Sequence, residues 1–273
     1  MFALSDSKLT YIYTGGKTWN ADLLKTKKPT LVFVHGAQHD HSVWALQSRY
    51  FANHGYPVIA IDLPGHGRSA GPALTTVESI ANWLGNLLME LKISNAIVIG
   101  HSMGSLIALE LAASAGPSIK GLALLGTAIP MPVSDGLLKL THTSEASAFD
   151  QINAWSHSTI AQRPGSPGPG FSTYIQNMRL MQRQLPGLLH IDFSACNNYA
   201  NGAKSAANVA CPVIIIQGQS DMMTPVKNAR ESMKLFNTAP SFVIIDQAGH
   251  ALMAERPDAV LIALRSWINN LPL

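Results

Sequence analysis

Short apolar runs alternate with longer segments of helical periodicity along most of this chain. The runs are Leu31–Val34, Val58–Ile61, Ala96–Ile99, Leu122–Leu125, Val213–Ile216 and Phe242–Ile245. Short runs that are apolar at every position are typical of strands buried on both faces, as in a parallel sheet. Helical spacing predicts helices near 43–53, 76–91, 103–115, 226–236 and 256–270. The alternation therefore predicts an α/β fold with a mostly parallel central sheet flanked by helices.

The alternation stops after Gly126 and resumes only at Val213. The intervening segment has helical patches and a Pro/Gly-rich stretch at 163–170, which can be neither a helix nor a central strand. A structureless loop of this length is uncommon inside a compact domain. We therefore predict a core of residues 1–126 and 211–273 and a helical cap insertion at 127–210. Leu9–Tyr13 is expected to form an antiparallel edge strand.

Composition excludes several classes of protein. Apolar residues make up 47% of the chain and charged residues 13%, which excludes intrinsic disorder. The net charge of +3 comes from scattered basic residues, so we expect no nucleic-acid partner. No apolar run is long enough to cross a membrane, and no signal peptide is visible. Two cysteines, Cys196 and Cys211, do not make a disulfide scaffold, and a cytoplasmic protein is expected.

The strongest chemical signal is Gly100-His101-Ser102-Met103-Gly104, which follows a predicted strand and opens a predicted helix. This is the context of a G-x-S-x-G nucleophile elbow, where glycines permit a sharp turn and the serine projects from the strand end. The Met103 backbone N–H would lie at a helix N-terminus, where the partial positive charge can face an oxyanion. The motif predicts Ser102 as a nucleophile and Met103 as an oxyanion donor.

A serine nucleophile needs a base, and the base needs an acid to orient it. His250 follows the last predicted strand and Asp221 follows the strand before it, so the chain order is Ser, Asp, His, one known order of this triad. Asp246 and Asp135 are weaker candidates for the acid, because the first sits in the last predicted strand, four residues before His250, and the second lies in the insertion. Asp221 has a rival role as a helix cap before Pro225, which we expect only if it turns away from His250.

The loop after the first of the buried strands, His35-Gly36-Ala37-Gln38, is the expected source of a second oxyanion N–H. Ala37 is the preferred donor and Gln38 the adjacent alternative. The next residues, His39-Asp40-His41, suggest a metal site, but side chains at i and i+2 in such a loop do not converge without further ligands. We therefore expect no metal here and a solvated loop at the mouth of the site.

The chain resembles the α/β-hydrolase fold superfamily, in its group of serine esterases, lactonases and C–C hydrolases, over residues 9–271. The resemblance rests on the motifs above together with Asp62-Leu-Pro-Gly-His-Gly-Arg-Ser69 and with Ala248-Gly-His250 followed by Glu255-Arg-Pro257. It implies Ser102 as nucleophile, Asp221 as orienting acid, His250 as base, Ala37 and Met103 as oxyanion donors, and no cofactor. The loop at 62–69 is structural in this group, so no catalytic role is implied for His66.

The implied reaction is acyl transfer, in which Ser102 attacks a carbonyl and water then hydrolyses the acyl-enzyme. The leading prediction is a carboxylesterase of class EC 3.1.1 that acts on a small or medium hydrophobic ester, a small-molecule substrate. The alternatives are an enol-lactonase or a C–C bond hydrolase of ring-cleavage products, and a ligand sensor that retains the triad. Expected pocket residues are Gln38 and, in the cap, Trp155, Phe171 and Met178. Fold and triad leave the natural substrate and the oligomeric state open.

Overall fold

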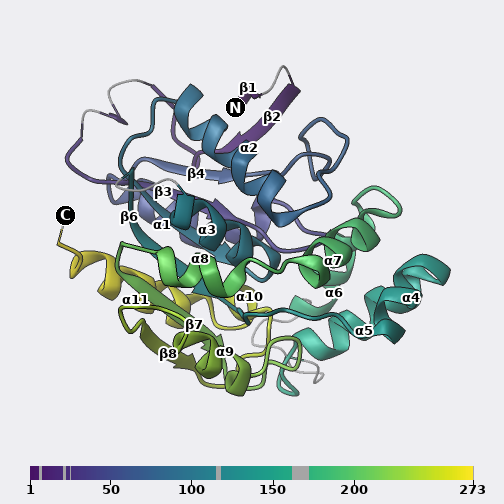
Figure 1. Ribbon diagram of the computed structural model, residues 1–273. Coiled ribbons are helices and arrows are strands. Elements are labelled where there is room, and N and C mark those ends of the chain that lie inside the picture. Colours follow the sequence, from purple (N-terminus) through teal and green to yellow (C-terminus); the bar gives the residue numbers. More distant parts are fainter. Residues whose placement is uncertain (6–7, 21–22, 25, 115–117, 162–171, 273) are drawn as a thin grey trace.

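The computed structural model describes residues 1–5, 8–20, 23–24, 26–114, 118–161 and 172–272 (Figure 1). Strands β1 to β8 form one sheet in the order β1-β2-β4-β3-β5-β6-β7-β8. Their bounds are Phe2–Ser5, Lys8–Tyr13, Thr30–Val34, Val58–Ile61, Ala96–His101, Ile119–Leu125, Val213–Gly218 and Ser241–Ile245. Strands β3 to β8 pair in parallel, and each contains one of the six predicted runs. The predicted α/β fold with a mostly parallel sheet is confirmed.

The predicted strand Leu9–Tyr13 is present as β2, but its expected place at the edge of the sheet is wrong. β2 pairs antiparallel with β4 on one side and with β1 on the other, so β1 is the outermost strand. An outermost strand pairs on one side only and can leave apolar side chains in solvent, and Phe2 and Leu4 of β1 are 49% and 63% exposed. The apolar residues of β1 are therefore mostly exposed, unlike those of β3, which are buried at every position.

Helices cover both faces of the sheet. They are η2 (His41–Trp44), α1 (Ala45–Asn53), α2 (Val77–Glu90), α3 (Met103–Ser114), α4 (Asp135–Thr143), α5 (Glu145–Ser156), α6 (Thr173–Gln182), α7 (Leu188–Asn198), α8 (Gly202–Asn208), α9 (Val226–Met233), α10 (Leu252–Glu255) and α11 (Pro257–Asn269). Within β3, Val32 and Val34 pack into a core with α2, α3, α8 and α9, whereas Leu31 and Phe33 pack into a core with α1, α10 and α11. This alternation explains why each central strand is apolar throughout.

Helices α4 to α8 form the insertion between β6 and β7 (Figure 1). Helices α4 to α7 lie together beyond one end of the sheet, whereas α8 packs on α3. Tyr199 and Ser205 fix this last part of the insertion, because the hydroxyl of each donates a 2.6 Å hydrogen bond to Glu110 Oε2 on α3. A helical insertion is thus present, and its boundaries at 127 and 210 stay a prediction. The Pro/Gly-rich stretch at 163–170 lies outside the described residues.

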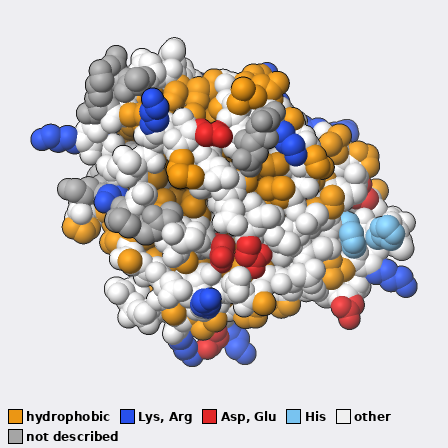
Figure 2. All heavy atoms as spheres, turned by 45° about the horizontal axis from the view of Figure 1, so that its top comes forward, with side chains coloured by type: hydrophobic (Ala, Val, Ile, Leu, Met, Phe, Trp, Pro, Cys, Tyr) orange, Lys and Arg blue, Asp and Glu red, His pale blue; other side chains and the backbone are white. Residues whose placement is uncertain are grey.

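Three observations bear on the expectations from composition. No helix in the described part of the chain is both long and apolar enough to span a bilayer. Figure 2 shows basic and acidic side chains interspersed with apolar ones over the face in view. Cys196 and Cys211 are both free thiols.

Candidate active site

The turn between β5 and α3 holds Ser102 in a left-handed backbone conformation, with φ of 53°. Side-chain-bearing residues rarely adopt this conformation, and in a nucleophile elbow it makes the serine project from the turn. Two glycines permit the turn. A Cβ atom on Gly100 would collide with the backbone of Gly104, and one on Gly104 would collide with the carbonyls of Val34 and His35. Ser102 is therefore presented, partly exposed, at the carboxyl end of β5.

The loops after β7 and β8 bring Asp221 and His250 together at the same end of the sheet. His250 Nδ1 lies 2.8 Å from Asp221 Oδ2, and both side chains are buried. His101, which precedes Ser102, fixes His250 beside the elbow, because its Nε2 lies 2.8 Å from the His250 carbonyl. Burial, helped by the neighbouring His250, lowers the pKa of His101 well below its usual value, so its ring is neutral and donates this bond. With Nδ1 bonded to Asp221, the imidazole of His250 keeps Nε2 for proton transfer.

Asp221 fixes the turn before α9 and faces His250 at the same time, but it is not the cap of α9, whose N-cap is Pro225. Its Oδ1 accepts hydrogen bonds of 2.8 Å from the backbone N–H groups of Met223 and Thr224, which form the turn that leads into α9. Its Oδ2 accepts the bond from His250. A carboxylate has about four lone-pair sites on its two oxygens, so one oxygen can fix the turn while the other faces the base.

Two neighbours of Asp221 are functional candidates that the sequence did not reveal. Gln217 Nε2 and Thr224 Oγ1 each donate a 2.8 Å hydrogen bond to Asp221 Oδ2, and Thr224 Oγ1 lies 3.2 Å from His250 Nδ1. These bonds hold in place the oxygen that faces His250. Gln217 is a polar residue at a buried position of the central strand β7. This was the one feature of the sequence that could have indicated its role beside Asp221.

The loop after β3 approaches the elbow closely. A Cβ atom on Gly36 would lie 3.1 Å from the Ser102 Cβ, tighter than most Cβ contacts, so glycine favours this close approach. Within the described part of the chain, the backbone N–H groups of Ala37 and Met103 have no hydrogen-bond partner. The Gln38 N–H, by contrast, donates a 2.8 Å bond to Asp192 Oδ2 on α7. The alternative donor is occupied, which leaves Ala37 and Met103 as our proposed oxyanion donors.

His35 holds the peptide that carries the Ala37 N–H. Its Nδ1 lies 2.8 Å from the Gly36 carbonyl, and its Nε2 accepts a 3.1 Å bond from the Leu63 N–H. This pair of bonds requires a neutral ring with its proton on Nδ1. Burial, with the nearby charge of His66, lowers the pKa of His35 to about 4, so the ring stays neutral at physiological pH.

We expect His35 to make the free energy of unfolding fall as the pH drops from 6.5, the ordinary pKa of histidine, towards about 4, its pKa in the folded protein. In that window the unfolded chain binds a proton at this histidine and the folded chain does not, so acid favours unfolding, by about 3 kcal/mol at most. Urea titrations of wild type and His35→Asn at several pH values measure the slope. The exposed His54 gives the control His54→Asn. An identical slope in wild type and His35→Asn would contradict the assignment.

Two cavities flank the triad. The smaller, of about 230 Å³, contains Ser102 and is lined otherwise by Met131, Pro132, Val133, Ser134, Leu137, Trp155, Phe193, Cys196, Met222, Met223 and Thr224. The larger, of about 590 Å³, contains His250 and lies between η2, α1, α10 and the insertion helix α6. Residues of the insertion thus form walls of both cavities. The nucleophile borders one cavity and the base borders the other.

The structure describes three of the four predicted pocket residues, and they lie in different surroundings. Trp155 lines the smaller cavity together with Ser102. Gln38 is buried and donates a 3.0 Å hydrogen bond from Nε2 to the Met181 carbonyl, and Met178 packs against the main hydrophobic core. Phe171 lies outside the described residues.

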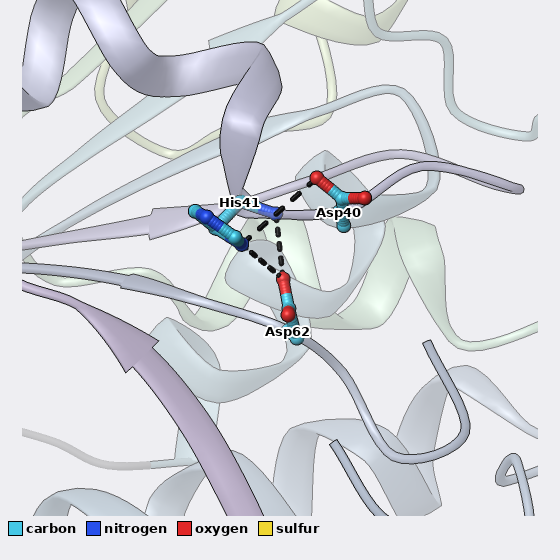
Figure 3. Close-up of side chains that lie close together, drawn as sticks. All are labelled: Asp40, His41 and Asp62. Atoms are coloured by element: carbon cyan, nitrogen blue, oxygen red, sulfur yellow. Dashed lines mark hydrogen bonds and ion pairs between the residues drawn. The ribbon is translucent and has the colours of Figure 1, made fainter. Parts of the chain in front are cut away.

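Asp40, His41 and Asp62 lie with their potential ligand atoms within 4.8 Å of one another (Figure 3). Protein donors already engage these carboxylates. Asp62 Oδ1 accepts from the backbone N–H and from Nδ1 of His41, at 2.8 and 2.7 Å. Asp40 Oδ2 accepts from Arg183 and Gln184. Although burial alone would raise the pKa of Asp40, bonds from Ser42 and Arg183 lower it overall. A cation would have to displace Arg183, so we propose no metal at this cluster.

Comparison with known proteins supports the fold and the class of chemistry. Residues 31–263 match the Alpha/beta hydrolase family. The chain is 24% identical to an (E)-2-((N-methylformamido)methylene)succinate hydrolase of Acinetobacter baylyi, over 89% of this chain and 91% of that protein. It is 26% identical to a pimeloyl-[acyl-carrier protein] methyl ester esterase of Vibrio cholerae, over 81% and 87%. The enol-lactonase structure from Burkholderia xenovorans superposes with a TM-score of 0.83 at 20% identity, over 99% of this chain and all of that one. This chain therefore belongs to the alpha/beta hydrolase family.

Proposed function

We propose that the protein is a carboxylesterase that cleaves small or medium hydrophobic esters through an acyl-enzyme on Ser102. The observation that carries the proposal is the cavity of about 230 Å³ at Ser102. Its described lining includes no Lys, Arg, Asp or Glu and is made largely of Met, Leu, Val, Trp and Phe side chains. An apolar cavity beside a nucleophile favours an apolar acyl group over a charged one.

The proposed reaction uses each group in turn. His250 Nε2 accepts the proton of the Ser102 hydroxyl as Oγ attacks the ester carbonyl, and the N–H groups of Ala37 and Met103 stabilise the oxyanion. The carbonyl re-forms as the C–O bond breaks, and His250 returns the proton to the leaving alcohol. Water then attacks the acyl-enzyme by the same route and releases the acid. Asp221 stays ionised, keeps the His250 proton on Nδ1 and stabilises the imidazolium.

The two cavities fit the two halves of an ester. The base must reach the leaving oxygen, so the alcohol belongs on the side of His250, where the cavity of about 590 Å³ lies. The acyl group then occupies the smaller cavity at Ser102. We propose that the insertion, residues 127–210, is a cap that selects substrates, because its side chains form walls of both cavities.

An enol-lactonase or a C–C bond hydrolase would use the same triad, and the enol-lactonase superposition keeps this candidate open. A ligand sensor that retains the triad is the alternative from another class. Values of kcat/KM for p-nitrophenyl esters of graded acyl length, enol-lactones and vinylogous 1,5-diketones separate the enzymes. Fast hydrolysis of the shorter esters supports the proposal. Preference for a lactone or diketone favours the second candidate, and slow turnover of every substrate with ligand-dependent thermal stabilisation identifies a sensor.

We expect Trp155→Ala to shift selectivity towards longer acyl chains, because it enlarges the cavity on the acyl side of Ser102. Ethyl hexanoate and hexyl acetate are isomers that differ in which side of the ester carries the long chain. The variant should favour ethyl hexanoate by an amount on the order of 1–3 kcal/mol in relative kcat/KM. Kinetics with both esters, for wild type and variant, measure the ratio.

The matched control is Trp267→Ala on α11, a tryptophan that packs against the opposite core of the sheet. Its loss should lower the thermal midpoint and change the rates of both esters by the same factor. If Trp155→Ala lowers the midpoint and leaves the ester ratio unchanged, Trp155 belongs to the core of the insertion, and other residues select the acyl group.

A further inference from the structure

Gln38, which follows the proposed oxyanion donor Ala37, is held in a strained conformation by the insertion. Its φ is 57°, a left-handed value that is costly for a residue with a side chain. Two contacts from the insertion fix it. The backbone N–H donates a 2.8 Å bond to Asp192 Oδ2 on α7, and the side-chain Nε2 donates a 3.0 Å bond to the Met181 carbonyl on α6. The core of the protein therefore does not shape this loop alone.

Asp192 also binds the core at a second point. Its Oδ2 lies 2.9 Å from Nε2 of His66, in the loop after β4, and both side chains are buried. His66 Nδ1 lies 3.1 Å from the Pro64 carbonyl, so both ring nitrogens face acceptors, as an imidazolium requires. Burial alone would lower the pKa of His66, but Asp192 outweighs it and the pKa is raised. The positive ring offsets a carboxylate that would otherwise oppose an oxyanion nearby.

Asp192 uses only one of its two carboxylate oxygens in these contacts. Oδ1 is buried and, within the described part of the chain, has no hydrogen-bond partner. A buried ion pair with an unsatisfied oxygen is poor evidence for stability, since desolvation offsets much of the attraction. Such groups in native structures need another explanation. Here the paired oxygen contacts the peptide beside the proposed oxyanion hole.

We propose that Asp192 is a positioning residue for the oxyanion hole, through which the insertion holds the loop at Ala37 in its active conformation. The inference rests on the proposed function. Asp192 accepts a hydrogen bond from the Gln38 N–H and keeps the Gln38 backbone left-handed. Of the two neighbouring N–H groups, only that of Ala37 then remains available to an oxyanion at Ser102. The insertion thereby builds part of the catalytic machinery as well as walls of the substrate cavities. Efficient hydrolysis then requires that the insertion pack on the core with Asp192 bonded to the Gln38 N–H.

The test compares Asp192→Ala with Asp192→Asn, which retains an acceptor for the Gln38 N–H. Losing an oxyanion donor outright costs about 10²–10³ in kcat, and a misplaced donor should cost less. We expect Asp192→Ala to lower kcat by roughly 10- to 100-fold with little change in KM. Asp192→Asn should recover most of this loss. Kinetics with one fast ester and thermal midpoints of both variants give the numbers.

Gln184→Ala is the matched control. Gln184 is buried and also ties the insertion to the core, through bonds of 2.8 Å from the Gly67 N–H and 3.0 Å to Asp40 Oδ2. It bonds neither Ala37 nor Gln38, the two residues whose conformation Asp192 is proposed to fix. We expect it to lower the thermal midpoint and to leave kcat close to wild type. A fall in kcat equal to that of Asp192→Ala would mean that any loosening of the insertion has the same effect, and it would overturn a specific role for Asp192.

A trifluoromethyl ketone gives a second readout, because its adduct with serine carries an oxyanion. Its inhibition constant should rise in Asp192→Ala by the factor by which kcat falls, and should stay unchanged in Gln184→Ala. An unchanged constant in a folded Asp192→Ala overturns the inference and leaves the proposed function intact. If the ketone does not inhibit the wild type, the result contradicts the serine mechanism on which the inference rests.

Discussion

Replacing Ser102 with alanine is expected to abolish ester hydrolysis while the protein stays folded. The hydroxyl forms the covalent bond to the acyl group, and no other group at the elbow can replace it. In another serine hydrolase, loss of the nucleophile lowered kcat by about 2 × 10⁶. The substitution removes one partly exposed oxygen from a turn whose strain is set by the backbone, so the thermal midpoint should change little. Steady-state kinetics and a thermal melt of Ser102→Ala test both statements.

Ser114→Ala provides the control, because Ser114 is an exposed serine at the opposite end of α3. It should keep wild-type activity. A fluorophosphonate should add one adduct to wild type and to Ser114→Ala, at Ser102, and none to Ser102→Ala. Retention of more than a few per cent of the activity in Ser102→Ala would show that the nucleophile lies elsewhere.

The central strands and the elbow could be predicted from the sequence because their signals are local. A strand buried on both faces must be apolar at every position, and a strand-to-helix turn as sharp as the one at Ser102 needs Gly100 and Gly104. In a parallel sheet the carboxyl ends of the strands lie at one edge. That the residues after β5, β7 and β8 lie close together could therefore be predicted without knowing the tertiary structure.

The contacts that hold the site together could not be predicted, because their partners are far apart in the chain. Asp192 is one of several acids in the insertion, and nothing near it in the sequence indicates that it reaches Gln38 and His66. Gln38 was expected in the pocket, and no feature of the sequence indicated that its side chain bonds to Met181. Pairs of this kind follow from how the insertion packs on the core, and one sequence carries no signal for that packing.

Asp221→Asn is expected to lower kcat by about 10⁴, the loss seen for the same change in another triad. The contacts of Asp221 set the direction of the new amide. The N–H groups of Met223 and Thr224 require an acceptor, so the amide oxygen should take the place of Oδ1. The amide NH₂ then faces His250 Nδ1. It can donate only to an unprotonated Nδ1, so the proton moves to Nε2, and His250 can no longer accept the proton of Ser102.

The two rival acids supply matched controls, because Asp135 and Asp246 are both exposed. Asp135→Asn and Asp246→Asn should each keep kcat within a few-fold of wild type, since neither change alters the His250 tautomer. The turn at Asp221 keeps its two backbone bonds in Asp221→Asn, so the thermal midpoint should fall far less than the activity. If Asp135→Asn is more damaging than Asp221→Asn, the acid of the triad has been assigned to the wrong residue. The 2.8 Å contact between Asp221 and His250 would then be structural.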